Sequence, residues 1–337
     1  MLKVAINGFG RIGRNFLKAS LESKSVSVVA VNDLADPETL GRLLKYDSVF
    51  GPFDGKVSWG KDSITVNGKK ISVSAEKDPS KLPWGKLGID IVLESTGRFR
   101  KYEECELHLK AGAKRVVISA PPKGDKPIKQ IVMGVNEGIY DAKKDLIISN
   151  ASCTTNCLAP IAKVLNDTFG IEKGFMTTIH AYTGDQMLLD GPHKDIRRAR
   201  AAGLNIVPTS TGAAKALGEV IPALKGKITG SAIRVPVADG SIVDLVVDLK
   251  KKPVPPEMIN DAIKKAAASG PMKGIIQYSE EPLVSSDIIR NPYSSIFDSL
   301  LTNVEGDLVE VFSWYDNEWG YSKRLVDLMG HMAKKWR

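Results

Sequence analysis

A glycine-rich turn between a strand and a helix is the feature that most restricts the fold of this chain. Residues 3–7 form a short apolar run, residues 8–13 read Gly-Phe-Gly-Arg-Ile-Gly, and residues 11–22 have helical spacing of apolar side chains. A second strand is expected at 26–31, and Asp33 follows it. An acidic residue about 20 positions after such glycines, in this strand–helix–strand setting, indicates a dinucleotide site on a Rossmann-type sheet.

Each glycine of the motif has a physical task. Gly8 permits the tight turn, Gly10 lets the backbone approach a pyrophosphate, and Gly13 lets the helix pack closely on the strand. The free N–H groups at the start of the helix would bind that pyrophosphate. The Asp33 carboxylate would accept hydrogen bonds from the ribose hydroxyls and repel a 2′-phosphate, which favours NAD over NADP. A glycine-rich turn without a ligand is the alternative, and the position of Asp33 weighs against it.

Alternation of strands and helices continues to about residue 150. Apolar runs at 89–93, 115–119 and 146–149 are bounded by turn residues, which is typical of βαβ units and a mostly parallel sheet. Asn67-Gly68 joins two β-rich runs and predicts a hairpin, an antiparallel addition to this sheet. We therefore expect an α/β domain over 1–150 with a doubly wound sheet.

The rest of the chain has longer strand-like runs. A helix is expected at 154–169 despite Pro160, and Ala238-Asp239-Gly240 predicts a hairpin turn between two strands. The predicted strands lie at 175–182, 231–237, 241–249 and 308–314. This pattern predicts an α+β domain over 151–317 with a mostly antiparallel sheet. A helix at 318–337 carries an apolar stripe, and we expect it to dock back on the first domain.

Composition excludes several classes of protein. No run approaches the roughly 18 consecutive apolar residues of a membrane helix, and no signal-peptide pattern follows Met1, so we expect a cytoplasmic protein without membrane partners. Three cysteines without zinc spacing argue against a disulfide framework and a metal site.

The net charge of +8 suits anionic ligands such as phosphates. Nucleic-acid binding is not favoured, because the basic residues are spread along the chain apart from one cluster at 194–200 and form no binding motif.

Cys153 is the strongest candidate for a nucleophile. It stands at the start of the helix predicted at 154–169, where free N–H groups and the helix dipole stabilise a thiolate and lower its pKa. Cys105 and Cys157 lie within helical stretches and are expected to be structural. A thiolate nucleophile needs an imidazole partner, and His180 lies near the end of a predicted strand. These patterns alone leave a structural role open for both side chains.

Three segments resemble the glyceraldehyde-3-phosphate dehydrogenase family. They are Ala-Ser-Cys-Thr-Thr-Asn-Cys at 151–157, Ile-Asn-Gly-Phe-Gly-Arg-Ile-Gly-Arg at 6–14 and Trp-Tyr-Asp-Asn-Glu-Trp-Gly-Tyr at 314–321. The cysteine segment is specific to the family, whereas the glycine motif is not. The resemblance implies NAD-dependent oxidative phosphorylation of glyceraldehyde 3-phosphate to 1,3-bisphosphoglycerate, in glycolysis and gluconeogenesis. The alternatives are a relative acting on another phosphorylated aldehyde, such as erythrose 4-phosphate, and a nucleic-acid-binding protein that retains the fold.

The resemblance also implies roles for the matching positions. Cys153 is the expected nucleophile and His180 its base, and a homotetramer with loop 183–203 at an interface is the expected assembly. The expected NAD contacts are Gly8, Gly10, Arg11, Ile12, Gly13, Asp33, Lys77, Thr96, Ser119, Pro192, Asn317 and Tyr321. The expected contacts to the substrate phosphate are Thr183, Asp185 and Arg234, and those to inorganic phosphate are Ser152, Thr154, Arg198, Thr211 and Gly212.

Overall fold

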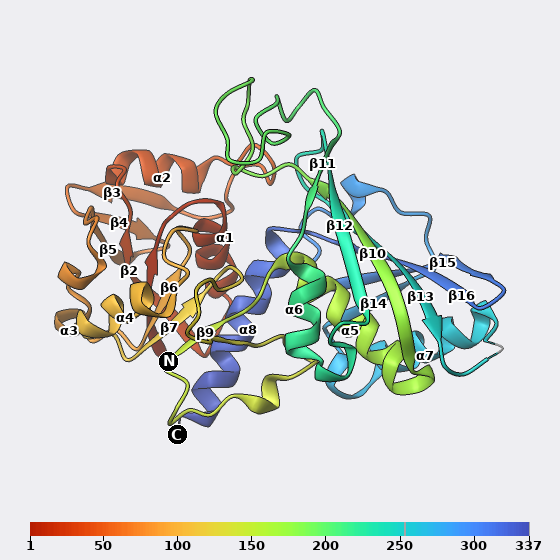
Figure 1. Cartoon of the computed structure of the whole chain (residues 1–337). Coiled ribbons are helices and arrows are strands. Elements are labelled where there is room, and N and C mark those ends of the chain that lie inside the picture. The colour runs from red at the N-terminus through yellow and green to blue at the C-terminus, as the bar shows by residue number, and fades with distance from the viewer. Residues whose placement is uncertain (253, 337) are drawn as a thin grey trace. The chain divides into compact units, whose positions relative to one another are not determined.

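The computed structural model describes residues 1–252 and 254–336, and the chain divides into two compact units (Figure 1). The first unit comprises Met1–Ile131, Glu137–Ala151 and the C-terminal segment from Ser322 onward. The second unit comprises Val132–Asn136 and Ser152–Tyr321. Arg337, the last residue of the helix predicted at 318–337, lies outside the described residues.

The first unit is built on a nine-stranded sheet with the order β3-β4-β5-β2-β1-β6-β7-β9-β8. Its strands are β1 (Leu2–Asn7), β2 (Val26–Asn32), β3 (Val57–Gly60), β4 (Ser63–Val66), β5 (Lys69–Ser74), β6 (Ile91–Glu94), β7 (Arg115–Ile118), β8 (Lys129–Gln130) and β9 (Ile147–Ser149). Its helices are α1 (Arg11–Ser20), α2 (Pro37–Lys45), α3 (Trp84–Leu87), α4 (Tyr102–Lys110) and most of α8 (Trp319–Lys335). From β5 to β8 all neighbouring strands are parallel, which confirms the predicted α/β class.

The Asn-Gly pair forms the predicted hairpin. Asn67 and Gly68 have φ of 48° and 80°, and the two flanking strands, β4 and β5, pair antiparallel. Positive φ at both central residues is the geometry of the tight turn that matches the twist of paired strands, and asparagine and glycine adopt it most easily. Because β5 also pairs in parallel with β2, the hairpin extends the main sheet at one edge.

A buried polar network lies at the carboxyl end of β6. Trp84 Nε1 donates to His108 Nδ1 at 3.0 Å, so the other ring nitrogen, Nε2, carries the proton and donates to Glu94 Oε2 at 3.0 Å. Asn7 Nδ2 donates to the same carboxylate oxygen at 2.6 Å. His108 is fully buried. The network supplies partners for a buried carboxylate, as burial of such a group requires.

The second unit contains a seven-stranded mixed sheet with the order β11-β12-β10-β13-β16-β15-β14. Its strands are β10 (Ile171–Ala181), β11 (Val207–Ser210), β12 (Ile228–Val235), β13 (Ser241–Leu249), β14 (Ile276–Ser279), β15 (Ser295–Glu305) and β16 (Leu308–Tyr315). Its helices are α5 (Cys153–Phe169), α6 (Ala213–Val220) and α7 (Pro256–Ala268). Four strand pairs are antiparallel and two are parallel, so the predicted mostly antiparallel sheet is confirmed.

The hairpin predicted at residues 238–240 is wrong. The strands on either side, β12 and β13, do not pair with each other, because β10 lies between them (Figure 1). β10 pairs in parallel with β12 and antiparallel with β13. The link between the strands instead crosses the end of β10, where Tyr182 N donates to Val237 O at 3.0 Å. Gly240, with φ of +85°, supplies the turn that starts β13.

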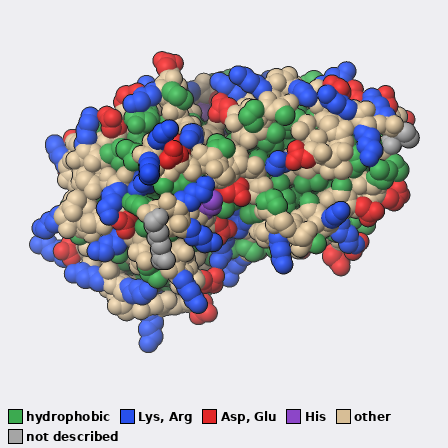
Figure 2. All heavy atoms as spheres, turned by 90° about the horizontal axis from the view of Figure 1, so that it is seen from below, with side chains coloured by type: hydrophobic (Ala, Val, Ile, Leu, Met, Phe, Trp, Pro, Cys, Tyr) green, Lys and Arg blue, Asp and Glu red, His purple; other side chains and the backbone are tan. Residues whose placement is uncertain are grey.

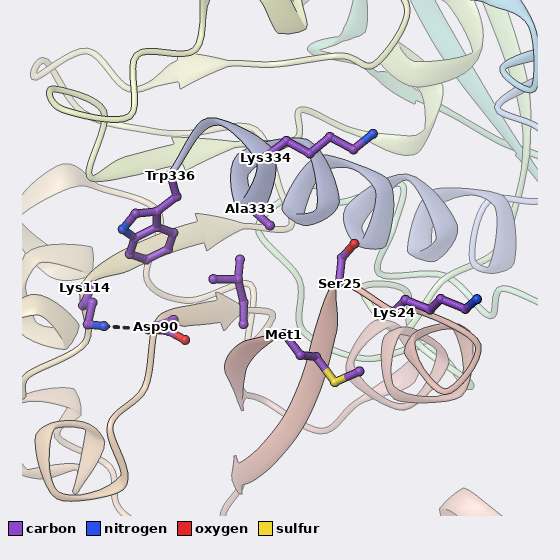
Figure 3. Close-up of a pocket in the computed structure, with 9 residues that line it drawn as sticks. Met1, Lys24, Ser25, Asp90, Lys114, Ala333, Lys334 and Trp336 are labelled. Atoms are coloured by element: carbon purple, nitrogen blue, oxygen red, sulfur yellow. Dashed lines mark hydrogen bonds and ion pairs between the residues drawn. The ribbon is translucent and has the colours of Figure 1, made fainter.

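The C-terminal helix α8 packs within the first unit from Ser322 onward. Leu325, Leu328 and Met329 are fully buried, and Lys323 Nζ forms an ion pair with Glu22 at 2.8 Å. The end of α8 and the start of the chain line a cavity of about 490 Å³, with Trp336 and Lys114 on one side of it (Figure 3). None of the predicted site residues lines this cavity.

Charged side chains of both signs are interspersed on the face of the molecule shown in Figure 2. In the part of the chain that the structure describes, no helix combines the length and the apolar character that crossing a membrane would require.

Candidate functional site

The glycine motif lines a cavity of about 470 Å³ in the first unit. A Cβ atom on Gly8, where φ is +92°, would lie 2.7 Å from the backbone nitrogen of Thr96. A Cβ on Gly13 would lie 2.4 Å from the carbonyl oxygen of Gly8, whereas one on Gly10 would meet nothing within 4 Å. The turn is therefore tightly packed at the first and third glycines and open at the second. This geometry fits a pyrophosphate, since only the open position is needed for its approach.

Asp33 is held at the edge of this cavity by backbone donors. Its Oδ2 accepts from Phe9 N at 2.7 Å, and its Oδ1 accepts from Ala35 N at 3.2 Å. Each carboxylate oxygen retains acceptor capacity for a ribose hydroxyl. The anchored charge also disfavours a ligand that carries a 2′-phosphate at the same place.

Replacing Asp33 by glycine is expected to relax the preference for NAD. The loss of a repulsion of roughly 1–4 kcal/mol should raise the ratio of kcat/KM for NADP to that for NAD by about fivefold to several hundredfold. Asp33→Asn is the matched control for geometry, because it keeps an acceptor for a backbone N–H while removing the charge, and it should shift the ratio in the same direction. An unaltered ratio in both variants would contradict the role of the charge.

The other NAD contacts expected in the first unit differ in their surroundings. Lys77 and Thr96 line the cavity, and Thr96 N donates to Glu94 Oε1 at 2.9 Å. Arg11 instead forms an ion pair with Asp47 at 2.7 Å, and Ile12 and Ser119 do not line the cavity. Sequence reasoning missed several lining residues, which follow the carboxyl ends of strands, where ligands bind in such sheets. They include Asn7, Asn32, Leu34, Glu76 and Phe99.

Cys153 is the first residue of α5, as predicted. Ala151 has φ of 56°, a sharp local turn, and the next residue, Ser152, caps the helix by accepting from Thr155 N at 3.0 Å. These contacts fix the backbone on both sides of the thiol. Cys153 Sγ lies 3.5 Å from His180 Nε2, within hydrogen-bond reach of a sulfur donor.

Two groups contact Nδ1 of His180. The carbonyl oxygen of Ala181, 2.6 Å away, can only accept, whereas NH1 of Arg234, 3.0 Å away, can only donate. The shorter contact with Ala181 favours the tautomer that carries the proton on Nδ1. The lone pair of Nε2 then faces the Cys153 thiol. His180 lies on the buried face of β10 with Met176 and Thr178.

Burial and a neighbouring guanidinium set the protonation of the pair. Burial and then the charge of Arg234 lower the pKa of His180 to about 3. Burial raises the pKa of Cys153, although Arg234 and the N–H of Thr154 act in the opposite direction. The lowered cysteine pKa predicted from helix position is therefore wrong, because loss of hydration outweighs the helix end. The raised pKa of the thiol and the lowered pKa of the imidazole both favour the neutral form of each group.

Two arginines lie among the predicted phosphate contacts. Arg234 NH1 donates to Ala181 O at 2.9 Å and to Thr183 Oγ1 at 3.3 Å, which brings two of the predicted residues together beside His180. Arg198 forms an ion pair with Asp185, and its Nε donates to Thr209 Oγ1 at 3.0 Å. Asp185 thus orients an arginine rather than presenting a donor to an anion.

The remaining predicted phosphate contacts lie at helix starts. Thr211 Oγ1 accepts from Ala213 N at 3.2 Å, and Gly212 is the N-cap of α6. Thr154 Oγ1 lies 2.9 Å from Tyr315 OH. The hydroxyls of Ser152 and Thr154 therefore already have partners within the second unit.

Comparison with known proteins agrees with this arrangement. Residues 2–102 match the family model described as glyceraldehyde 3-phosphate dehydrogenase, NAD binding domain, and residues 152–317 match that of the C-terminal domain. The chain belongs to the glyceraldehyde-3-phosphate dehydrogenase family. It is 59% identical over 335 residues to glyceraldehyde-3-phosphate dehydrogenase 1 of Bacillus subtilis (strain 168), which covers 99% of both chains. The corresponding protein of Geobacillus stearothermophilus is 58% identical over 335 residues, again 99% of both chains.

Three of the expected NAD contacts, Asn317, Tyr321 and Pro192, lie in the second unit. Asn317, in the segment that resembles the family near the C-terminus, is buried and accepts from Ser241 Oγ at 2.6 Å. Tyr321 is buried, and Pro192 lies in the loop between β10 and β11. The cofactor of the family is NAD, which supplies a hydride acceptor when bound.

Sequence reasoning missed two residues of this dehydrogenase site. Tyr315 OH lies 2.9 Å from both Thr154 Oγ1 and Thr178 Oγ1, and its ring meets His180 edge-on with centroids 5.8 Å apart. Ser241 contacts Asn317 and the backbone beside His180. Both partners are distant in sequence, so no local pattern could indicate these contacts.

The other two cysteines are buried, which fits the structural role expected for them. Cys105 and Cys157 are free and buried, and burial raises the pKa of the Cys157 thiol to about 12. Within residues 1–252 and 254–336, no group of three or more histidine, cysteine or acidic side chains is arranged to hold a metal ion.

Proposed function

We propose that this chain oxidises and phosphorylates D-glyceraldehyde 3-phosphate to 1,3-bisphosphoglycerate with NAD and inorganic phosphate, in glycolysis and gluconeogenesis. The single observation that carries the proposal is the contact of 3.5 Å between Cys153 Sγ and Nε2 of His180, in a member of this family. We further propose that the first unit, with the glycine cavity, binds NAD, and that the second unit carries the chemistry.

The first chemical step is attack of sulfur on the aldehyde carbon. As the S–C bond forms, His180 Nε2 takes the thiol proton of Cys153, and the carbonyl electron pair moves onto oxygen. The backbone N–H of Cys153 and the protonated His180 are the proposed donors to this oxyanion. Return of the proton from His180 gives a neutral thiohemiacetal.

The second step is oxidation. His180 takes the hydroxyl proton of the thiohemiacetal while its carbon loses a hydride, so that the C–O bond becomes a carbonyl and a thioester remains on Cys153. Inorganic phosphate then attacks the thioester carbonyl. The C–S bond breaks, the acyl phosphate leaves, and the proton held by His180 returns to the sulfur.

We assign the substrate phosphate to Arg234 and Thr183, with Asp185 in a supporting role, and inorganic phosphate to Arg198, Ser152, Thr154, Thr211 and Gly212. The proximity of Arg234 to His180 supports a link between binding and chemistry. Because the charge of Arg234 is one cause of the lowered pKa of His180, an anion bound to this guanidinium should raise that pKa toward neutrality and strengthen the base.

An NADH absorbance assay tests the proposal. Glyceraldehyde 3-phosphate with NAD should produce NADH rapidly only when inorganic phosphate is present, and blocking the thiols should abolish the signal. A panel with erythrose 4-phosphate at fixed NAD and phosphate separates the two phosphorylated aldehydes. Higher kcat/KM for erythrose 4-phosphate, or turnover that does not depend on phosphate, would contradict the assignment.

We also propose a homotetramer that acts in the cytoplasm without a metal. Two separate apolar surfaces support the assembly. One is the face of the second sheet opposite α5, where Phe175, Ile179, Ile242 and Trp314 are exposed or half-buried. On the same face, Asp244 Oδ1 is buried with no partner among the described residues, and burial and then Glu310 raise the pKa of Asp244 to about 6. An apolar surface around such a group suits contact with a second copy.

The second surface is the loop between β10 and β11. It exposes Leu188, Leu189, Ile196, Leu204 and Ile206, of which Leu188 is 85% exposed. Two distinct self-complementary surfaces, each used by a two-fold axis, generate a closed tetramer. Exposure of two such apolar surfaces to water is unfavourable for a monomer in free energy.

A charged substitution on one of the two surfaces is expected to convert the tetramer into dimers. Native mass spectrometry of the unaltered protein should give the mass of four chains of 36.5 kDa. Phe175→Asp, at a side chain that is 68% exposed, should give two-chain species held by the loop surface. Ile139→Asp replaces an exposed apolar side chain outside both surfaces and should leave the mass unchanged. A single-chain mass for the unaltered protein would contradict the tetramer.

A further inference from the structure

Asn317 is held by a buried serine at the start of β13. Ser241 Oγ lies 2.6 Å from Asn317 Oδ1, and both residues are almost fully buried. Ser241 Oγ also accepts a hydrogen bond from the backbone N–H of Ala181 at 3.0 Å, and Ala181 directly follows His180. One hydroxyl therefore connects the strand that carries the proposed base with the amide of Asn317.

This contact fixes the direction of the Asn317 amide. The N–H of Ala181 can only donate, so it occupies a lone pair of Ser241 Oγ and the hydroxyl proton is available for Asn317 Oδ1. With the amide reversed, an NH₂ group would face Ser241 and the buried hydroxyl proton would lose this acceptor, at a cost in free energy. In residues 1–252 and 254–336, no residue accepts a hydrogen bond from Asn317 Nδ2. The nitrogen end is thus the end available to a ligand.

The backbone at Asn317 is fixed by other groups. The carboxylate of Asp316 accepts from the backbone N–H groups of Arg290 at 2.7 Å, Glu318 at 2.8 Å and Trp319 at 2.5 Å. Removal of the Ser241 hydroxyl should therefore release the side chain of Asn317 while the turn that carries it stays in place.

We propose that Ser241 is a positioning residue for the nicotinamide end of the cofactor. It holds the Asn317 amide with its N–H donors outward, so that the site accepts a carbonyl oxygen rather than an amino group. This inference rests on the expected contact of Asn317 with NAD, and it places that contact at the nicotinamide carboxamide. In this proposal, Ser241 determines whether Asn317 binds the carbonyl oxygen or the amino group of that carboxamide.

The test compares the binding of two dinucleotides to the full-length assembled protein without substrate. NAD carries a carboxamide, whereas 3-acetylpyridine adenine dinucleotide keeps the carbonyl oxygen but has a methyl group in place of the amino group. Dissociation constants for both are measured by quenching of tryptophan fluorescence. In Ser241→Ala the Asn317 amide can turn, and its oxygen can then meet the amino group of NAD but not the methyl group of the analogue. The analogue should lose about tenfold in affinity relative to NAD, the effect of one hydrogen bond.

Three further variants make the result decisive. Ser241→Cys keeps most of the side-chain volume with a weakly bonding sulfur, and should shift the ratio in the same direction. Ser299→Ala removes another serine hydroxyl, bonded to Ser279 O at 2.7 Å, and should leave the ratio unchanged. Asn317→Ala should weaken both ligands.

Two outcomes overturn the inference in different ways. An unchanged ratio in both Ser241 variants, with weakened binding in Asn317→Ala, overturns the role of Ser241 and leaves that of Asn317 standing. Unchanged binding of both ligands in Asn317→Ala removes the role of Asn317 and the inference together.

Discussion

Cys153→Ser should reduce turnover of glyceraldehyde 3-phosphate with NAD and phosphate to background. A hydroxyl has the hydrogen-bonding ability of the thiol but is far less ionised at neutral pH than a thiol with an ordinary pKa of about 8.5. It is also a poor leaving group, so the final attack by phosphate would be blocked as well. The NADH absorbance assay measures the loss directly.

The control for this variant is Cys157→Ser. Cys157 is fully buried four positions further along α5, and its Sγ lies 3.7 Å from Ser295 Oγ, where a hydroxyl can replace it. This variant should keep most of the activity and should still lose it to thiol-blocking reagents, whereas Cys153→Ser should retain NAD binding. Near-normal turnover by Cys153→Ser would refute the nucleophile.

His180→Asn should slow the oxidation step by about 10²–10⁴-fold, the usual contribution of a general acid–base. Asparagine keeps a polar group in the buried position but has no lone-pair nitrogen to take a proton from sulfur or from the thiohemiacetal. Rapid-mixing measurements of a single turnover report this step apart from product release.

Measurements of NAD affinity and thermal stability distinguish a chemical role of His180 from a structural one. NAD affinity and the thermal midpoint of His180→Asn should stay close to those of the unaltered protein. A single-turnover rate that is also unchanged would remove His180 from the mechanism. A variant that folds and binds NAD but reacts slowly would support the base, because only the proton acceptor has been altered.

Local sequence signals predicted the features that depend on neighbouring residues. The glycine turn, the Asn67-Gly68 hairpin and the position of Cys153 at a helix start follow from backbone preferences within a few residues. The predicted hairpin at Ala238–Gly240 failed because β10, far earlier in the sequence, lies between the two strands. A turn signal states that the chain reverses or bends, but the strands that pair are decided by the whole sheet.

The site was predictable to the extent that its chemistry uses distinctive residue types. A cysteine at a helix start and a histidine near a strand end are visible in a sequence, and the structure places their side chains 3.5 Å apart. Tyr315 meets Thr154 from 161 positions away, and Ser241 meets Asn317 from 76 positions away. Tyrosine and serine are common residues, so their roles depend on contacts that only the folded chain creates. The pKa of Cys153 also required the structure, because burial is not a local property of the sequence.

The helix α8 makes the first unit depend on residues that follow the whole of the second unit in the chain. Most of that unit is translated before Ser152, yet Leu325, Leu328 and Met329 join its interior only after the whole of the second unit has been made. Until then the nascent glycine-loop unit exposes the apolar surface that α8 will cover, the kind of surface that chaperones bind. A premature stop codon near residue 320 would therefore impair nucleotide binding, although the glycine loop is encoded some 300 codons earlier, while the strands beside Cys153 would keep their sequence.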